Sequence, residues 1–196
     1  MKRIILFRFL SALLISGSAV AEEARIANWW VSGTRDCNKN SVQLIQNGNA
    51  YSFLFNQFGP QLEENEQQSV DVKVCKITVK FELPKDTCIY QIDQLLSGGL
   101  IKTEGARGRF HFTARLNGIN RVQQKTLWDF GTAISPEDPE SIVTYSLTQP
   151  TTCLRLRYQT YRAELFFSAS KKQRRDFFLG AIDSLDQGLS LRVRTR

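Results

Sequence analysis

The 196-residue sequence is poor in the residues from which most metal and catalytic sites are built. It contains one histidine, His111, which excludes any site that needs two imidazole ligands. Its four cysteines include no C-x-x-C pair, and no G-x-S-x-G, H-E-x-x-H or phosphate-loop motif occurs. We therefore expect no metal ion, no cofactor and no enzymatic activity.

No apolar run reaches the roughly 20 residues that a membrane-spanning helix requires. The N-terminal run, residues 9–15, follows Lys2, Arg3 and Arg8 and precedes Ala19-Val20-Ala21, the small-x-small pattern of a signal peptidase site. We predict a signal peptide over residues 1–21, cleaved after Ala21, and one exported domain over 22–196. The short signal and the absence of Asn-x-Ser/Thr sites favour a bacterial protein, periplasmic or secreted.

The positive charge is concentrated in the last quarter of the chain. The whole sequence carries a formal charge of +7, and loss of the three basic residues of the signal peptide leaves 23 basic and 19 acidic side chains. From residue 154 onward there are 10 basic and 4 acidic side chains. Any attraction to a polyanion should therefore come from the C-terminal strands.

The exported part consists of short β-type runs separated by turn residues. An Asn47-Gly48-Asn49 turn predicts a hairpin, and residues 109–116 alternate without fault, with Arg109, His111 and Arg115 facing water. In residues 70–83 the apolar positions switch parity between Val74 and Cys75, which predicts a bulge or burial on both faces. The predicted strands cover residues 41–46, 50–55, 70–83, 88–96 (ending at Gly98-Gly99), 109–116, a segment ending at Phe130, 142–147, 153–158, 162–167 and 189–193.

These strands and turns indicate an all-β fold, an antiparallel β-sandwich of the jelly-roll or immunoglobulin-like kind. Residues 177–185 suit a helix or a strand. An even number of cysteines in an exported chain predicts two disulfides. If the Pro84 turn closes a continuous hairpin, Cys75 lies roughly 25 Å from Cys88, too far to bond. Two pairings remain: Cys37–Cys75 with Cys88–Cys153, which we prefer, or Cys37–Cys88 with Cys75–Cys153.

Several motifs occur together in a recognisable order. They are Val31-Ser32-Gly33-Thr34 before Cys37, Phe53-x-Phe55-x-x-Phe58, Cys75-x-Ile77-x-Val79 leading to Pro84, then Gly98 or Gly99, and Phe110 with Phe112. Over residues 30–116 the chain resembles the secreted domain-of-unknown-function family 4360. The resemblance implies a small exported β-rich domain with cysteines at Cys37 and Cys75, and it supplies no activity. Cys88, Asn38-Lys39-Asn40 and the basic tail depart from the family pattern.

The basic tail is the most distinctive candidate site. We predict that it binds an anionic polysaccharide, lipopolysaccharide or an envelope protein through guanidinium and ammonium groups, without specific nucleic-acid recognition. A charged sheet edge that discourages aggregation is the competing interpretation. The candidate binding residues are Arg155, Arg157, Lys171, Lys172, Arg174, Arg175, Arg192 and Arg194.

Two other functions remain open at this stage. One is a neutral-sugar lectin or carbohydrate-active enzyme that uses tryptophans and paired carboxylates; the other is a structural part of a surface assembly. Adjacent residues of a strand face opposite ways, so one of Trp29 and Trp30 should be buried and the other exposed. The remaining candidates are Trp128, the carboxylates of Glu63, Glu64, Glu66, Asp183 and Asp186, and a candidate calcium loop at Glu137, Asp138 and Glu140.

Overall fold

The computed structural model describes residues 23–117, 123–130, 141–148, 155–182 and 188–196, and every regular element in these ranges is a β-strand. The predicted signal peptide, residues 1–21, lies outside them. The strands are β1 (Arg25–Gly33), β2 (Val42–Asn47), β3 (Ala50–Phe55), β4 (Gln61–Leu62), β5 (Val70–Glu82), β6 (Ile89–Lys102), β7 (Ala106–Leu116), β8 (Gln123–Phe130), β9 (Ser141–Thr148), β10 (Tyr158–Lys171), β11 (Phe178–Ile182) and β12 (Leu189–Thr195).

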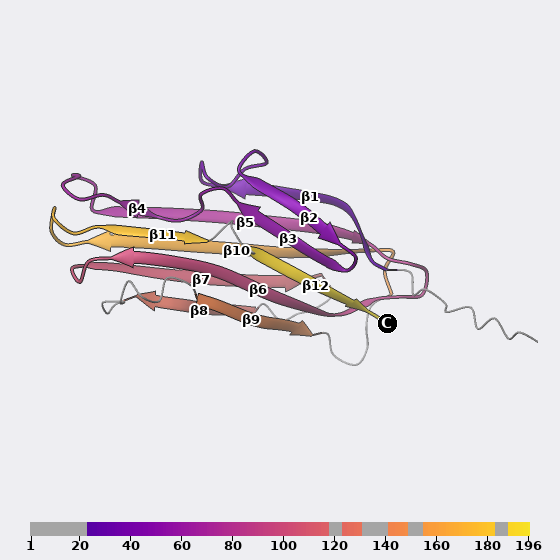
Figure 1. Ribbon diagram of the computed structural model, residues 1–196. Coiled ribbons are helices and arrows are strands. Elements are labelled where there is room, and N and C mark those ends of the chain that lie inside the picture. The colour runs from indigo at the N-terminus through magenta and orange to yellow at the C-terminus, as the bar shows by residue number, and fades with distance from the viewer. Residues whose placement is uncertain (1–22, 118–122, 131–140, 149–154, 183–187) are drawn as a thin grey trace, which may run out of the picture.

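Two antiparallel sheets pack face to face and confirm the predicted β-sandwich. The five-stranded sheet has the order β1-β5-β10-β7-β8. The seven-stranded sheet has the order β2-β3-β12-β6-β11-β4, with β9 also paired to β6. Figure 1 shows the strands running along the long axis of the molecule, with the turns after β5 and after β10 at opposite ends. The lengths of β5 and β10 therefore set the length of the outer face of the five-stranded sheet, the face turned away from the other sheet.

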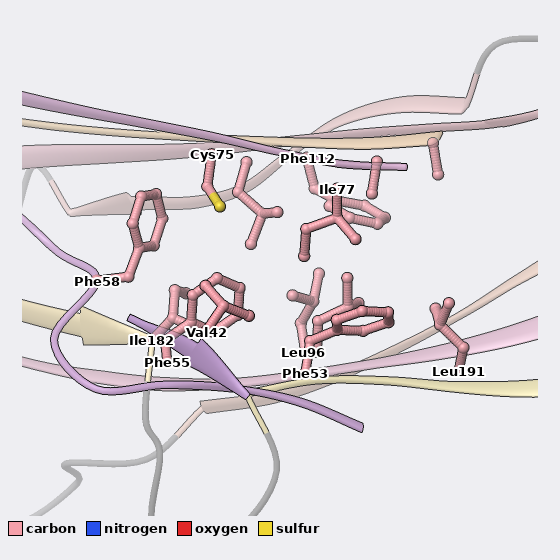
Figure 2. Packing of buried hydrophobic residues seen from close by; sticks show 14 of the residues in the cluster. Val42, Phe53, Phe55, Phe58, Cys75, Ile77, Leu96, Phe112, Ile182 and Leu191 are labelled. Carbon is pink, nitrogen blue, oxygen red and sulfur yellow. The ribbon is translucent and has the colours of Figure 1, made fainter. Parts of the chain in front are cut away.

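Alternate residues of both sheets fill the space between them. Figure 2 shows Cys75, Ile77 and Phe112 of the five-stranded sheet facing Phe53 and neighbouring side chains of the other sheet. These side chains are almost completely buried, and burying one large apolar side chain contributes about 1.5–3 kcal/mol. The strict alternation predicted for residues 109–116 is confirmed, because every second residue of β7 from Ala106 to Leu116 is buried.

The predicted hairpin forms between β2 and β3. Asn47 pairs with Ala50, so the turn consists of Gly48 and Asn49. Gly48 has a φ of +57°, the left-handed region in which glycine is least strained. Glycine at the first central position is typical of a type II′ turn, whose twist matches that of the flanking strands.

The parity switch in β5 has a different cause from either of those predicted. The register of β5 against β10 is continuous from Val70 to Glu82, without a bulge. The valines at the start of the strand lie on the outer face, where Val70 is 54% exposed and Val72 39% exposed. The prediction of a bulge or of burial on both faces was therefore wrong, because these valines lie on an exposed part of the sheet.

Strand β6 continues through the glycines at which the sequence predicted its end. A Cβ atom on Gly98 would lie 2.8 Å from the carbonyl oxygen of Ala181 on β11. The glycine therefore allows close approach of a neighbouring strand. The Pro84 turn was also misassigned: β5 and β6 belong to different sheets, so the turn crosses between sheets and closes no hairpin.

The region after residue 153 contains fewer and longer strands than predicted. Residues 155–157 precede the strand, and the segment from Tyr158 to Lys171 is the single strand β10. Two strands, 153–158 and 162–167, were predicted there, but residues 159–161 continue the alternation and join them, with Gln159 and Tyr161 buried. Residues 178–182 form β11, which decides between helix and strand in favour of a strand.

A disulfide joins Cys37 to Cys75, with 5.3 Å between the Cα atoms. This confirms the preferred partner of Cys37. The hairpin used to exclude Cys75–Cys88 does not exist, so that argument does not apply, and the pairing of Cys75 with Cys37 excludes it instead. Cys88 is also disulfide-bonded, and Cys153 lies outside the described residues.

Candidate functional site

The basic residues predicted as one binding face are divided among three places. Arg155 and Arg157 precede β10, and residues 171–175 lie at its end and in the turn beyond. These two groups are separated by a strand of 14 residues, about 45 Å at the usual rise per residue. Arg192 and Arg194 lie on β12 in the other sheet. The candidate residues therefore form no single surface.

Three of these side chains have partners within the protein. Arg157 lies 3.0 Å from a carboxylate oxygen of Glu82, and Arg194 lies 2.9 Å from Asp93. Lys171 is buried, and its ammonium group donates to the backbone carbonyl of Glu63. Lys172, Arg174 and Arg175 are exposed in the turn that follows β10.

The outer face of the five-stranded sheet brings a different set of residues together. Trp30 of β1 is opposite Thr78 of β5, and Thr78 is also opposite Arg162 of β10. Arg162 is opposite Arg115 of β7. These four residues, which we call the Arg–Trp row, cross four adjacent strands. Because adjacent strands are about 4.8 Å apart, the row spans roughly 14 Å between its end backbones.

Arg115 and Arg162 are the unusual members of this row. Like charges directly opposite each other in a sheet are destabilising, yet both side chains are exposed and on the same face. Within the described part of the chain, neither guanidinium forms an ion pair or a side-chain hydrogen bond. Two cations therefore stand side by side with their donors open to solvent.

A depression of about 430 Å³ surrounds the two arginines. The other described residues that line it are Ser32, Lys76, Thr78, Thr113, Ala163 and Glu164. Glu164 is the one carboxylate among them, and it lies 3.5 Å from the ammonium group of Lys76. The depression thus combines unneutralised guanidinium groups with hydroxyls that can donate or accept hydrogen bonds.

Aromatic side chains lie on the same outer face. Trp30 is 45% exposed. Trp29 faces the core, with its ring 5.8 Å from that of Phe53, but it is only half-buried, so the two tryptophans face opposite ways as predicted while neither is fully buried. Tyr158 lies at the end where β10 begins, with the ammonium of Lys80 4.2 Å from its ring centre. Trp30 and Tyr158 therefore lie on the same face as the basic depression, outside its lining.

The other predicted candidates contribute nothing to this face. Glu63, Glu64 and Glu66 are exposed in the loop between β4 and β5. Asp183, Asp186 and the candidate calcium loop at 137–140 lie outside the described residues, and nothing is described of the Trp128 side chain. In the described ranges, no group of three or more His, Cys, Asp or Glu side chains is arranged to hold a metal ion.

Local patterns identified the direction of these side chains but not their neighbours. The alternation of residues 109–116 placed Arg115 in water, and Arg162 was an outward position of a predicted strand. Their opposition depends on the pairing of β7 with β10, which are far apart in the sequence. The feature of the sequence that could have indicated this site was the run of outward-facing basic residues on β7.

The outer face of the seven-stranded sheet has a carboxylate with several partners. Burial alone would raise the pKa of Asp93, but hydrogen bonds from Ser146, Gln91 and Arg194 outweigh burial and hold the pKa below its ordinary value of 3.8. Arg194 Nε donates to Asp93 at 2.9 Å and Ser146 Oγ at 2.7 Å. Ionised Asp93 therefore joins β6, β9 and β12.

We expect Asp93→Asn to lower the urea midpoint at pH 7 and to make little difference near pH 2. A carboxyl whose pKa is lower in the folded state stabilises the fold above its unfolded pKa, and this contribution is lost as pH falls through the folded pKa. Because that pKa lies below 3.8, the two proteins should converge only under strongly acidic conditions. If the urea midpoints of wild type and Asp93→Asn differed equally at pH 7 and pH 2, ionised Asp93 would not be the source of this stabilisation.

Across the described ranges, the chain forms no helix with the length and apolar character needed to cross a membrane. Among known proteins, no family model and no curated protein matches the chain.

Two solved structures resemble it at low similarity. One is TmCBM61 in complex with β-1,4-galactotriose, with 14% identity and a TM-score of 0.32, covering 87% of this chain and 91% of that chain. The other is the enzymatically active domain of tailspike protein 4 of bacteriophage CBA120, with 11% identity and a TM-score of 0.31, covering 87% of this chain and 19% of that chain. Values of this size establish no shared function.

Proposed function

We propose that this chain is an exported, non-enzymatic protein that binds an anionic glycan on the outer face of its five-stranded sheet. The observation that carries the proposal is the cross-strand pair of Arg115 and Arg162, exposed and without an acidic partner in the described part of the chain. A carboxylate, sulfate or phosphate between them would replace repulsion with charge-assisted hydrogen bonds.

The rest of the Arg–Trp row favours a sugar as the carrier of that anion. Trp30 lies two strands from Arg162, a separation of about 10 Å. An exposed indole presents an apolar face with a polar edge, which suits stacking against a sugar ring while the arginines hold its acidic group. The predicted export signal supports an extracellular glycan rather than a nucleic acid.

The lining of the depression supports binding without catalysis. Glycoside hydrolysis needs two carboxyl groups at a defined separation. In the described residues that line the depression, Glu164 is the one carboxylate, and it faces Lys76. The arrangement can hold and orient an acidic sugar, but it offers no acid–base pair beside it.

Affinity electrophoresis tests the proposal with polygalacturonate, dextran sulfate and neutral dextran as probes. We expect retardation by at least one acidic polysaccharide and none by dextran. Arg162→Gln and Arg115→Gln should each weaken this binding about tenfold or more, since a hydrogen bond to a charged group contributes about 1.5–3 kcal/mol. Unchanged binding in both variants would contradict the proposal.

Arg192→Gln is the matched control, because Arg192 is an exposed arginine on the opposite sheet. It should bind like the wild-type protein. A combined neutralisation of Lys172, Arg174 and Arg175 tests the sequence-based alternative at the turn after β10. Arg162→Gln should also melt no lower than wild type, because it removes a like-charge pair; this separates lost binding from lost folding.

A further inference from the structure

A second depression lies on the same outer face, further along the same strands. It has a volume of about 390 Å³ and is lined by Val70, Arg107, Gly108, Arg109, Ser168, Ala169 and Ser170. Arg107 is opposite Ser170, and Arg109 is opposite Ser168. Among the described residues that line it are two guanidinium groups and two hydroxyls, and no carboxylate. Arg109 is opposite Asp129 of β8, so Arg107, which is exposed, is the guanidinium here that corresponds to those of the first depression.

Both depressions are formed by β7 and β10, so they lie along one line. Arg107 and Arg115 are the ends of that line on β7, and eight residues of a strand extend about 27 Å. The outward positions between them repeat about every 7 Å and are Arg107, Arg109, His111, Thr113 and Arg115. One small anion cannot reach both ends of such a line.

An aromatic pair separates the two depressions. Phe166 of β10 is opposite His111 of β7, and their ring centres are 6.0 Å apart. Both side chains are half-buried on the outer face. The two rings are tilted by 58°, and the pair places an apolar ring surface between two basic depressions, on which the apolar face of a sugar ring can pack.

We infer that the ligand is an acidic polysaccharide chain that lies along β10 and contacts both depressions at once, with sugar units over Phe166 between them. This inference rests on the proposed function, and it adds the class of ligand and its direction on the sheet. Arginines at both ends of the line suit a polymer that carries several acidic groups along its length. Simultaneous contact at both ends makes the second contact intramolecular, so affinity rises once the chain spans the line.

Isothermal titration with galacturonate oligomers, from dimer to decamer, tests the inference. For the wild-type protein we expect affinity to rise at least tenfold over the series and then to level off. Arg107→Gln should bind the shortest oligomers like wild type and lose most of the gain with length. Arg162→Gln should weaken binding at every length, and Arg192→Gln should follow the wild-type curve.

The outcomes separate the two claims. Equal affinity at all lengths, or a gain with length that Arg107→Gln leaves intact, would overturn the extended site while dependence on Arg162 upheld the proposed function. No binding of any oligomer would overturn both for uronates, and the same series made with sulfated oligomers would then decide the matter for the other acidic class. Melting temperatures equal to wild type establish that each variant is folded.

Discussion

Replacement of Cys37 and Cys75 together by alanine is expected to lower the free energy of unfolding by about 4 kcal/mol. The disulfide closes a loop with a sequence separation of 38 residues, and the chain-entropy relation for a loop of that size gives about 4 kcal/mol at 25 °C. Both cysteines are buried, so alanine is preferred to serine, whose hydroxyl would be buried without an assured partner. Equilibrium urea unfolding followed by tryptophan fluorescence measures the difference.

The same disulfide also lies beside the end of β1, the strand that carries Trp30. Cys75 lies on β5 opposite Gly33, the last residue of β1, and Trp30 lies on β1. Chemical reduction is not a matched control, because Cys88 is disulfide-bonded as well. An unfolding free energy equal to that of the wild type would show that the disulfide does not stabilise the sandwich.

Phe167→Ala is expected to cost about 3–5 kcal/mol, the usual range for removing a large buried aromatic side chain. Phe167 is completely surrounded, with its ring 5.4 Å from that of Phe110 on β7 and 6.0 Å from that of Phe178 on β11. It therefore bridges the two sheets. A Cβ atom on Gly180 would lie 2.6 Å from Phe167 Cζ, so the ring already fills the space up to the opposite backbone. Urea unfolding measures the loss.

Phe166→Ala is the matched control, because it makes the same change one residue away on the other face. Phe166 is half-buried beside His111, and an aromatic pair contributes about 0.5–1.5 kcal/mol beyond its buried area. Its stability loss should be clearly smaller than that of Phe167→Ala, while its affinity for long acidic oligomers should fall. Equal losses of stability from both substitutions would contradict the assignment of the two faces.

The alternation of apolar and polar residues predicted the faces of a strand correctly where one face is buried and the other is exposed to solvent. Residues 109–116 were predicted with the correct inward and outward residues because adjacent Cβ atoms point to opposite sides of a strand. The hairpin at Gly48 was predicted for a similar reason, since the left-handed turn position is a local requirement. Membership of family 4360, export and the absence of enzymatic activity stay predictions.

Local patterns failed where a neighbouring strand determines the outcome. The glycines at 98 and 99 looked like a strand end, yet Gly98 accommodates the close approach of Ala181 on β11. Residues 159–161 separated two predicted strands, yet they belong to β10, with Gln159 and Tyr161 buried against the core. In both cases the local sequence is compatible with the continuation or the end of a strand, and pairing with a neighbouring strand decides between them.

By itself, the sequence determined the all-β class, the alternation of strands such as residues 109–116 and the outward direction of Arg115 and Arg162, because these depend on backbone geometry over a few residues. The tertiary structure decided which outward side chains are neighbours. It separated the C-terminal basic residues among two ends and two sheets, and it placed Arg115 opposite Arg162. Strand order and register follow from packing the whole core between two sheets, and no short stretch of sequence contains that information.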